Sequence, residues 1–207
     1  KRLLQNGHRC PFKRDIMSRP ASKSVRKDAA HNHAALLEAA REVLSEQGLD
    51  APLDLIAEKA GVGRGTLYRH FADRSELALA VLEADVADLG RRTEEQGDDP
   101  AVFFWFLDRL AEDMVRNAGL AGVVRNVRSP DALTPLRQSL MQAGAAPLKR
   151  AQAAGLVRGD LRPMDIRLIA TLLGAGFQGA DAAERQAVSR RTRAIILDGL
   201  RPRAGAC

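Results

Sequence analysis

The 207-residue sequence is poor in cysteine and in aromatic residues, and it contains no long apolar run. Its two cysteines, Cys10 and Cys207, lie near opposite ends of the chain, so we expect neither a disulfide framework nor a zinc site, and a cytoplasmic location. No apolar run approaches the roughly 18 residues that a membrane span needs, and the basic N-terminal stretch has no apolar segment typical of a secretory signal. Aromatic residues make up 4% and apolar residues 45% of the chain. Aliphatic packing must therefore build the core of a globular protein that does not contact a membrane.

Histidine is absent beyond residue 70. Because imidazole and thiolate groups are the main protein ligands of transition metals, this absence argues against a metal site in the C-terminal two thirds, and we expect no cofactor. The sequence also shows no Ser-His-Asp arrangement and no phosphate-binding loop that would predict catalysis. We therefore do not expect an enzyme.

Apolar residues recur at helical spacing along most of the chain, and no run alternates with the period of a strand. We expect the first helix to begin at Asn32 as its N-cap and to end at Gly48, and Asp73 or Ser75 to cap a helix that ends near Gly90. The other predicted helices span residues 53–61, 63–71, 101–117, 130–153, 163–179 and 182–199. The sequence thus predicts an all-α fold.

Residues 53–71, LDLIAEKAGVGRGTLYRHF, have the pattern of two helices joined by a glycine-containing turn. Gly61 permits the positive φ that such a turn needs. The residues expected to pack the two helices together are Ile56, Ala57, Ala60, Gly61, Val62, Leu67 and Phe71. Because Leu67 and Phe71 are four residues apart, they bury one face of the second helix and leave its polar face exposed. The segment therefore predicts a helix-turn-helix.

Polar residues cover the exposed face of that second helix. In a docked helix-turn-helix, the N-terminal part of the second helix meets base edges in the major groove of DNA. A guanidinium group can donate two hydrogen bonds to guanine, whereas tyrosine and histidine suit phosphate oxygens. The expected base contacts are Arg64, Thr66 and Arg69, and the expected phosphate contacts are Tyr68, His70 and Arg74.

The run from Leu36 to Leu82 resembles the DNA-binding domain of the TetR (tetracycline-repressor) family. The matching positions are Ile56, Ala57, Ala60, Gly61, Val62, Gly65, Leu67, Tyr68, His70, Phe71, Arg74 and Leu77. The resemblance implies a homodimer on a palindromic double-stranded DNA operator, with a C-terminal domain that binds a small effector and dimerises through its last two helices. The chain departs from the family pattern at Pro52, where Thr is frequent, and at Gly63, where Ser is usual, which weakens the cap of the second helix.

We divide the chain into a flexible basic arm (1–30), a helix-turn-helix DNA-binding domain (31–78) and a helical effector-binding and dimerisation domain (79–203). Residues 32–80 carry eight acidic residues against five Lys and Arg, although the whole chain has a net charge of +6. Because clustered cations supply much of the affinity for DNA, we expect the arm to add contacts, as minor-groove arms do. Six of the nine basic residues of the arm lie between residues 13 and 27, before the expected first helix: Lys13, Arg14, Arg19, Lys23, Arg26 and Lys27.

Four consecutive bulky residues, from Phe103 to Phe106, must be surrounded by protein on most sides. They pack in the core or line an apolar effector cavity between helices. The candidate cavity residues are Phe103, Phe104, Phe106, Met114, Met141 and Phe177. The expected effector is a small organic molecule, whose acidic group could pair with Arg109 or Arg137.

Residues 174–179 form a G-x-G-x-x-G motif after an apolar run, which taken alone is a dinucleotide-binding fingerprint. The upstream segments are predicted to be helical, which does not suit that motif. We therefore predict a DNA-binding transcriptional regulator that acts as a repressor and is released by its effector. The alternatives are a helical protein-interaction module and a nucleotide-binding enzyme that uses residues 174–179.

Overall fold

The computed structural model describes residues 23–48, 50–120, 130–175 and 181–202. In these ranges every regular element is a helix, and none is a strand. The elements are α1 (Lys23–Gln47), α2 (Leu53–Lys59), α3 (Arg64–His70), α4 (Arg74–Glu95), α5 (Val102–Arg116), the 3-10 helices η1 (Ala118–Leu120) and η2 (Pro130–Leu133), α7 (Thr134–Ala153), α8 (Asp165–Gly174) and α9 (Ala182–Leu200). The all-α prediction is confirmed. No helix in the described part of the chain is long and apolar enough to cross a membrane.

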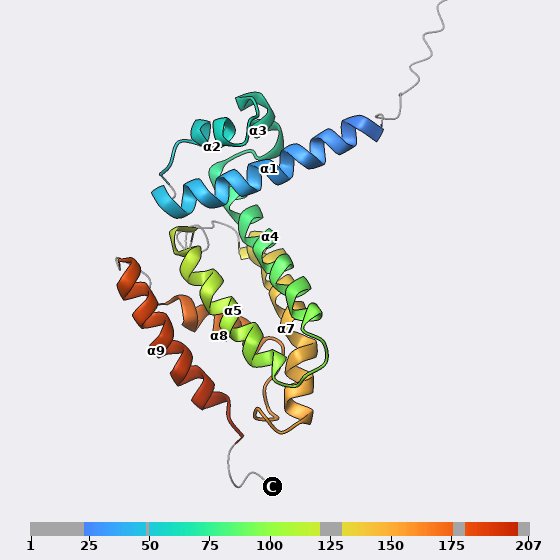
Figure 1. The fold of residues 1–207 in the computed structure, drawn as a ribbon, viewed down its shortest axis with the longest axis vertical. Coiled ribbons are helices and arrows are strands. Elements are labelled where there is room, and N and C mark those ends of the chain that lie inside the picture. The colour runs from blue at the N-terminus through green and yellow to red at the C-terminus, as the bar shows by residue number, and fades with distance from the viewer. Residues whose placement is uncertain (1–22, 49, 121–129, 176–180, 203–207) are drawn as a thin grey trace, which may run out of the picture.

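Helices α1, α2 and α3 form a small N-terminal unit at one end of the molecule, and α4 runs from it into the larger C-terminal body (Figure 1). The core of the unit joins α1 to the start of α4 through fully buried side chains such as Leu36, Leu44, Ile56 and Leu77. Leu120, at the end of η1, also lies in this core. The C-terminal body therefore contacts the N-terminal unit at two places along the chain.

Helix α1 begins at Lys23, nine residues before the expected N-cap Asn32. The prediction of Asn32 as a cap is wrong because residues 23–31 contain no glycine or proline, and their Ala, Lys and Arg favour a helix. The expected arm therefore overlaps α1 from residue 23 onward, and residues 1–22 lie outside the described part. The helix ends at Gln47, and Gly48 follows with φ +73°, as the sequence predicted.

Helix α4 continues past Gly90, where we expected it to stop, and ends at Glu95. A Cβ atom built on Gly90 would lie 3.4 Å from Ala143 Cβ, an ordinary van der Waals contact, so Gly90 lies inside α4 where this helix packs against α7. Gly97, with φ +78°, follows the true end. The start of α4 is fixed by Asp73, whose carboxylate accepts a hydrogen bond from the Glu76 N–H at 2.9 Å.

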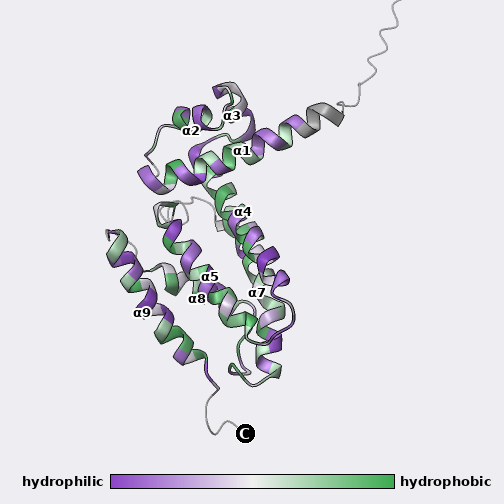
Figure 2. Ribbon diagram, viewed as in Figure 1, coloured by the Kyte–Doolittle hydropathy of each residue, from purple (hydrophilic) through white to green (hydrophobic). Residues whose placement is uncertain are grey.

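The C-terminal body packs α5 between α4, α7, α8 and α9. Figure 2 shows apolar residues along the facing sides of these helices. Gly144 of α7 faces Phe106, and a Cβ atom built on it would lie 2.9 Å from the Phe106 ring and 2.5 Å from Ile166 Cδ1. Phe103 and Phe106 are fully buried in this core, so the aromatic turn of α5 holds the bundle together.

Candidate nucleic-acid interface and internal cavity

A tight turn joins α2 to α3. Gly61 adopts φ +67°, and the Val62 N–H donates a hydrogen bond to the Ala57 carbonyl at 3.0 Å. This positive φ is disfavoured for residues with a Cβ atom, which explains glycine at the position. The turn fixes the direction in which α3 leaves α2.

One face of α3 is buried against the N-terminal core. Leu67 is 1% exposed and Phe71, directly after the helix, is 3% exposed. Ile56 and Ala57 of α2 are buried in the same cluster, and Ala60 and Val62 pack against it while half-buried. The residues selected from the sequence for packing therefore lie at the α2–α3 contact and hold α3 by one side.

The opposite face of α3 is open to solvent. The Arg64 side chain is 72% exposed and Tyr68 is 54% exposed. Arg69 is also exposed, whereas Thr66 is half-buried. The polar side chains of Arg64, Thr66, Tyr68 and Arg69 therefore lie on the part of α3 that is turned away from the core.

Thr66 and Arg69 form a single unit on that surface. The Arg69 guanidinium donates from Nε to the Gly65 carbonyl at 2.9 Å and from one terminal nitrogen to Thr66 Oγ1 at 3.0 Å. These contacts hold the guanidinium along α3. A base contact by either residue therefore involves both.

Arg64 has an acidic partner that the sequence analysis did not identify. Its guanidinium lies 2.5 Å from a carboxylate oxygen of Asp54, in the first turn of α2. Because both side chains are largely exposed, the pair contributes little to stability and can be exchanged for another partner. Sequence spacing alone did not place Asp54 beside Arg64, because the turn at Gly61 brings the two helices together.

His70 and Arg74 are less exposed than Tyr68, and both are half-buried. The His70 ring lies 5.8 Å from the His33 ring of α1 and 6.2 Å from the Phe71 ring. His70 thus contacts α1 as well as the surface. Neither Gly63 nor Pro52 supplies a side-chain cap to the helix it precedes, which agrees with the weakness expected at both positions.

The C-terminal body contains a cavity of about 570 Å³ between α4, α5, α7 and α8. Its lining comes from the middle of α4, the end of α5, the start of α7 and from α8, with residues such as Leu82, Met114, Leu140 and Thr171. The end of α5 leads directly into η1, which contacts α1. The cavity therefore lies toward the end of the body that contacts the N-terminal unit.

Only some of the candidate cavity residues expected from the sequence lie on this lining. Met114 lines the cavity, and Arg137 does so as well. Phe103 and Phe106 are fully buried in the core instead, because their side of α5 faces α7 at Gly144. The remaining candidates are Phe104 and Met141, which are half-buried away from the lining, and Phe177, which lies outside the described residues. Arg109 pairs with Glu112 at 2.5 Å and is not on the lining.

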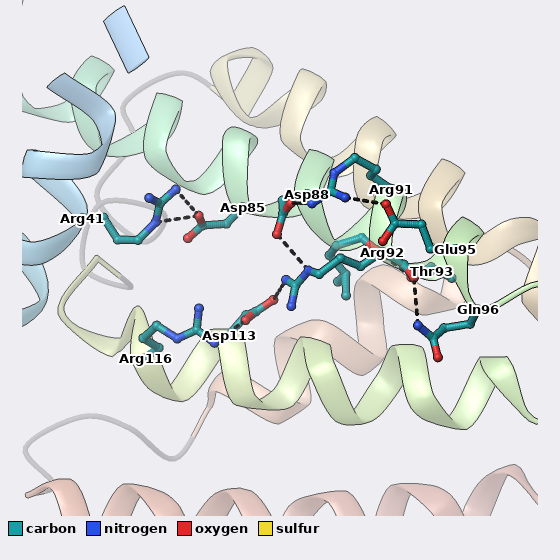
Figure 3. Close-up of polar contacts among 11 residues, drawn as sticks. Arg41, Asp85, Asp88, Arg91, Arg92, Thr93, Glu95, Gln96, Asp113 and Arg116 are labelled. Atoms are coloured by element: carbon teal, nitrogen blue, oxygen red, sulfur yellow. Dashed lines mark hydrogen bonds and ion pairs between the residues drawn. The ribbon is translucent and has the colours of Figure 1, made fainter. Parts of the chain in front are cut away.

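The sequence analysis missed five polar residues of the lining: Asp85 of α4, Asp113 of α5, Asn117 at the end of α5, and Arg167 and Thr171 of α8. Burial raises the pKa of Asp113, as does the nearby Asp85, whereas Arg116 and Arg92 oppose this effect. In Figure 3, Asp113 lies between these two arginines, at 3.2 Å from Arg92 and 2.9 Å from Arg116. The signal was present in the sequence, because Asp113 and Asn117 are four residues apart and alternate with Leu110 and Met114 on α5.

The glycine motif at residues 174–179 has no strand before it. Residues 165–174 form α8, and a Cβ atom built on Gly174 would lie 2.8 Å from Met114 Cε. A dinucleotide fingerprint requires a strand before its first glycine, so the structure does not support that alternative. Residues 176–180 lie outside the described residues. Among the described side chains, no group of three or more His, Cys, Asp or Glu is placed to hold a metal ion.

Two family models cover most of the chain. Residues 36–81 match the model of bacterial regulatory proteins of the tetR family, and residues 98–202 match the C-terminal domain of SbtR-like transcriptional regulators. The first match contains the whole α2–α3 arrangement. The second spans the C-terminal body.

Solved structures agree with both models. A TetR transcriptional regulator from Streptomyces coelicolor is 33% identical, with a TM-score of 0.61, over 83% of this chain and 99% of that one. A TetR regulator from Mycobacterium vanbaalenii is 31% identical, with a TM-score of 0.58, over 86% of this chain and 99% of that one.

Curated proteins match over about a third of the chain. An HTH-type transcriptional regulator of Staphylococcus aureus is 36% identical over 76 residues, which are 36% of this chain and 41% of that protein. The chain therefore matches less than half the length of this relative. The C-terminal family model covers half of the chain, and the solved relatives are aligned over nearly their whole length, so the protein belongs to the TetR family of helix-turn-helix, DNA-binding transcriptional regulators.

Proposed function

We propose that the protein is a cytoplasmic repressor that binds a palindromic operator as a homodimer and leaves it when a small organic effector occupies the cavity. The observation that carries this proposal is the exposed polar surface of α3, where Arg64 and Tyr68 are open to solvent while Leu67 is buried against the N-terminal core. Arg64, Thr66 and Arg69 contact bases in this proposal, and the phosphate contacts are Tyr68, His70 and Arg74.

An apolar surface on α8 and α9 supports the homodimer. Met164, directly before α8, and Leu168 and Leu172 of α8 recur every four residues and are each at least half exposed, and Ile195 of α9 is 56% exposed. Leu168 also lies at the edge of the cavity. Large apolar residues exposed in one contiguous set mark protein contacts. Two copies joined through this face would present two α3 helices, which must lie about 34 Å apart to enter successive major grooves.

DNA binding is tested by fluorescence anisotropy with duplexes selected from a random pool and with scrambled duplexes of the same length. Arg64→Ala is expected to weaken binding to the selected duplex by about 1–3 kcal/mol and to relax base preference at one position of each half-site. Arg91→Ala is the matched control, because Arg91 is an exposed arginine of α4 that pairs with Asp88 and Glu95. A protein that binds no duplex, or that prefers none, overturns the proposal and favours a helical protein-interaction module.

The arm is tested by deleting residues 1–22, which leaves α1 intact. The deletion removes Lys13, Arg14 and Arg19, so we expect weaker operator binding and a shallower dependence of affinity on salt concentration. An unchanged salt dependence contradicts a role of the arm in binding DNA.

A further inference from the structure

Asn117, a residue of the cavity lining, carries a buried hydrogen-bond acceptor without a partner among the described residues. Asn117 is 6% exposed, and its Oδ1 makes no hydrogen bond within the described part of the chain. Its amide nitrogen donates to Asp85 Oδ2 at 2.6 Å. Because a carboxylate can only accept, this contact fixes the orientation of the amide and leaves Oδ1 as the unpaired atom.

Leaving a buried acceptor unpaired costs free energy, and a ligand that supplies a donor recovers it. The lining around Asn117 includes Leu89, Leu110 and Met114, which suit the apolar body of such a ligand. The occupant that satisfies both features is an apolar molecule with one hydrogen-bond donor.

The charges near Asn117 are already compensated by protein groups. Asp85 pairs with Arg41, and Asp113 pairs with both Arg92 and Arg116. No carboxylate at this end of the cavity therefore requires a cation from the ligand. An anion or an acceptor would meet the oxygen atoms of Asn117 and Asp85. At this end of the cavity the neighbouring charges thus favour a neutral donor, such as a hydroxyl group, whereas Arg137 of α7 and Arg167 of α8 lie elsewhere on the lining.

Asn117 is also linked to the DNA-binding unit. It donates to one oxygen of Asp85, while the other oxygen of Asp85 accepts two hydrogen bonds from Arg41 of α1, at 2.9 and 2.6 Å (Figure 3 shows the Arg41–Asp85 pair). The residues directly after Asn117 form η1, where a Cβ atom built on Gly119 would lie 2.7 Å from the Leu44 carbonyl of α1. Movement of Asn117 therefore displaces groups that contact α1.

We propose that the cavity takes a neutral, apolar molecule that donates a hydrogen bond to Asn117 Oδ1, and that the Asn117–Asp85–Arg41 chain couples its binding to the position of α1. The ligand class rests on the cavity alone. The coupling rests on the proposed function, because it requires that the protein bind an operator.

The ligand class is tested with two probes of one shape, 2-naphthol, which carries a hydroxyl donor, and 2-methoxynaphthalene, which carries none. Both are titrated into the full-length protein without DNA by calorimetry. We expect 2-naphthol to bind about tenfold more tightly, as one recovered buried hydrogen bond predicts. Equal binding of the two probes, or binding of neither, overturns the assignment of the cavity.

Two substitutions in the cavity lining test whether Asn117 is responsible for the tighter binding of 2-naphthol. Asn117→Leu keeps the size of the side chain and removes the acceptor, so the two probes are expected to bind within twofold of each other. Thr171→Val is the control, because Thr171 also lines the cavity but donates to the Arg167 carbonyl of its own helix. It is expected to keep the tenfold preference. A preference that survives Asn117→Leu contradicts the role of Asn117. If Asn117→Leu does not fold, the comparison of the probes on the wild-type chain and on Asn117→Ala decides.

The coupling is tested by measuring operator affinity with and without saturating 2-naphthol. We expect saturating 2-naphthol to weaken operator binding by the wild-type protein at least fivefold. By thermodynamic linkage, operator binding must weaken the affinity of the protein for 2-naphthol by the same factor. Asp85→Asn is expected to reduce this factor to less than twofold, whereas Asp88→Asn, one turn along the same helix, keeps it.

The outcomes separate the two proposals. If no duplex binds but the probe preference is present, the proposed function fails and the ligand class stands. If a duplex binds and 2-naphthol changes its affinity equally in both aspartate variants, or not at all, the coupling through Asp85 is wrong.

Discussion

Arg41 of α1 donates two hydrogen bonds to Asp85 of α4, from Nε at 2.9 Å and from a terminal nitrogen at 2.6 Å. The side chains are 23% and 12% exposed, so this pair is the more shielded of the two ion pairs that Arg41 makes. Its other partner, Glu38, lies on α1 itself and is 64% exposed. Arg41 thus fixes α1 to the helix that leads into the C-terminal body.

The two partners of Arg41 are expected to differ in their contribution to stability. Asp85→Ala leaves a half-buried guanidinium and the Asn117 amide without their acceptor, and we expect it to lower the free energy of unfolding by about 2–3 kcal/mol. Glu38→Ala removes an exposed partner and is expected to change it by less than about 0.5 kcal/mol. Urea denaturation of both variants measures the two changes in the free energy of unfolding. Equal changes would show that shielding from solvent does not make the Arg41–Asp85 pair more stabilising than the Arg41–Glu38 pair.

Two carboxylates of the same ion-pair network are expected to give opposite pH dependence. Burial raises the pKa of Asp113, so its contribution to stability falls as pH rises above the unfolded pKa of about 4. A hydrogen bond from Arg91 lowers the pKa of Asp88, so its contribution is present above that pH and is lost as pH falls through the lowered folded pKa.

Asparagine variants test these directions by urea denaturation between pH 3 and 7. Relative to the wild-type protein, Asp113→Asn is expected to gain stability as pH rises from about 4. Asp88→Asn is expected to lose stability as pH rises toward about 4, with the loss complete once the wild-type Asp88 is ionised in both states. Parallel pH profiles for the two variants would contradict the assigned directions.

Gly61 and Gly63 lie on either side of the α2–α3 turn and are expected to respond in opposite ways to a side chain. Gly61 has φ +67° and open space around it, so Gly61→Ala costs about 1 kcal/mol from backbone conformation alone. Gly63 has φ −72°, no neighbour within 4 Å of a built Cβ atom, and no side-chain cap to offer α3. Gly63→Ser is therefore expected to stabilise by a few tenths of a kcal/mol. Thermal unfolding of the two variants measures both shifts, and destabilisation by Gly63→Ser would mean that α3 gains nothing from a cap.

Local signals in the sequence predicted the elements that depend on one residue and its neighbours. Gly48 and Gly61 were recognised because a positive φ excludes most other residues, and Leu67 and Phe71 because their spacing defines one helical face. Gly90 was misread as a helix end because a glycine inside a helix, here one that faces Ala143 of α7, looks the same in sequence as one that ends a helix.

The cavity could not be predicted in the same way. The aromatic turn of α5 drew attention, but Gly144, about 40 residues away, decides that Phe106 faces the core. Asp85 and Asn117 meet only when α4 and α5 pack together. The polar end of the cavity therefore depends on contacts between distant segments, which periodicity does not report.

The pair between Arg64 and Asp54 gives a prediction about DNA recognition. Asp54 places a negative charge 2.5 Å from the guanidinium that is proposed to contact a base. On a scrambled duplex Arg64 gains no base contact that replaces this partner, and the carboxylate repels nearby phosphates. We therefore expect Asp54→Asn to strengthen binding to scrambled duplexes several-fold and to strengthen operator binding less, which lowers the specificity ratio.

Glu58→Gln is the matched control, because Glu58 is an exposed acid of the same helix and the substitution removes the same charge. Anisotropy titrations of both variants at one salt concentration separate the local effect from the change in net charge. If Glu58→Gln lowers the specificity ratio as much as Asp54→Asn, the overall negative charge of α2 causes the effect, and the contact between Asp54 and Arg64 does not. If Asp54→Asn weakens operator binding, Asp54 orients Arg64 toward its base, and the pair is part of the recognition surface itself.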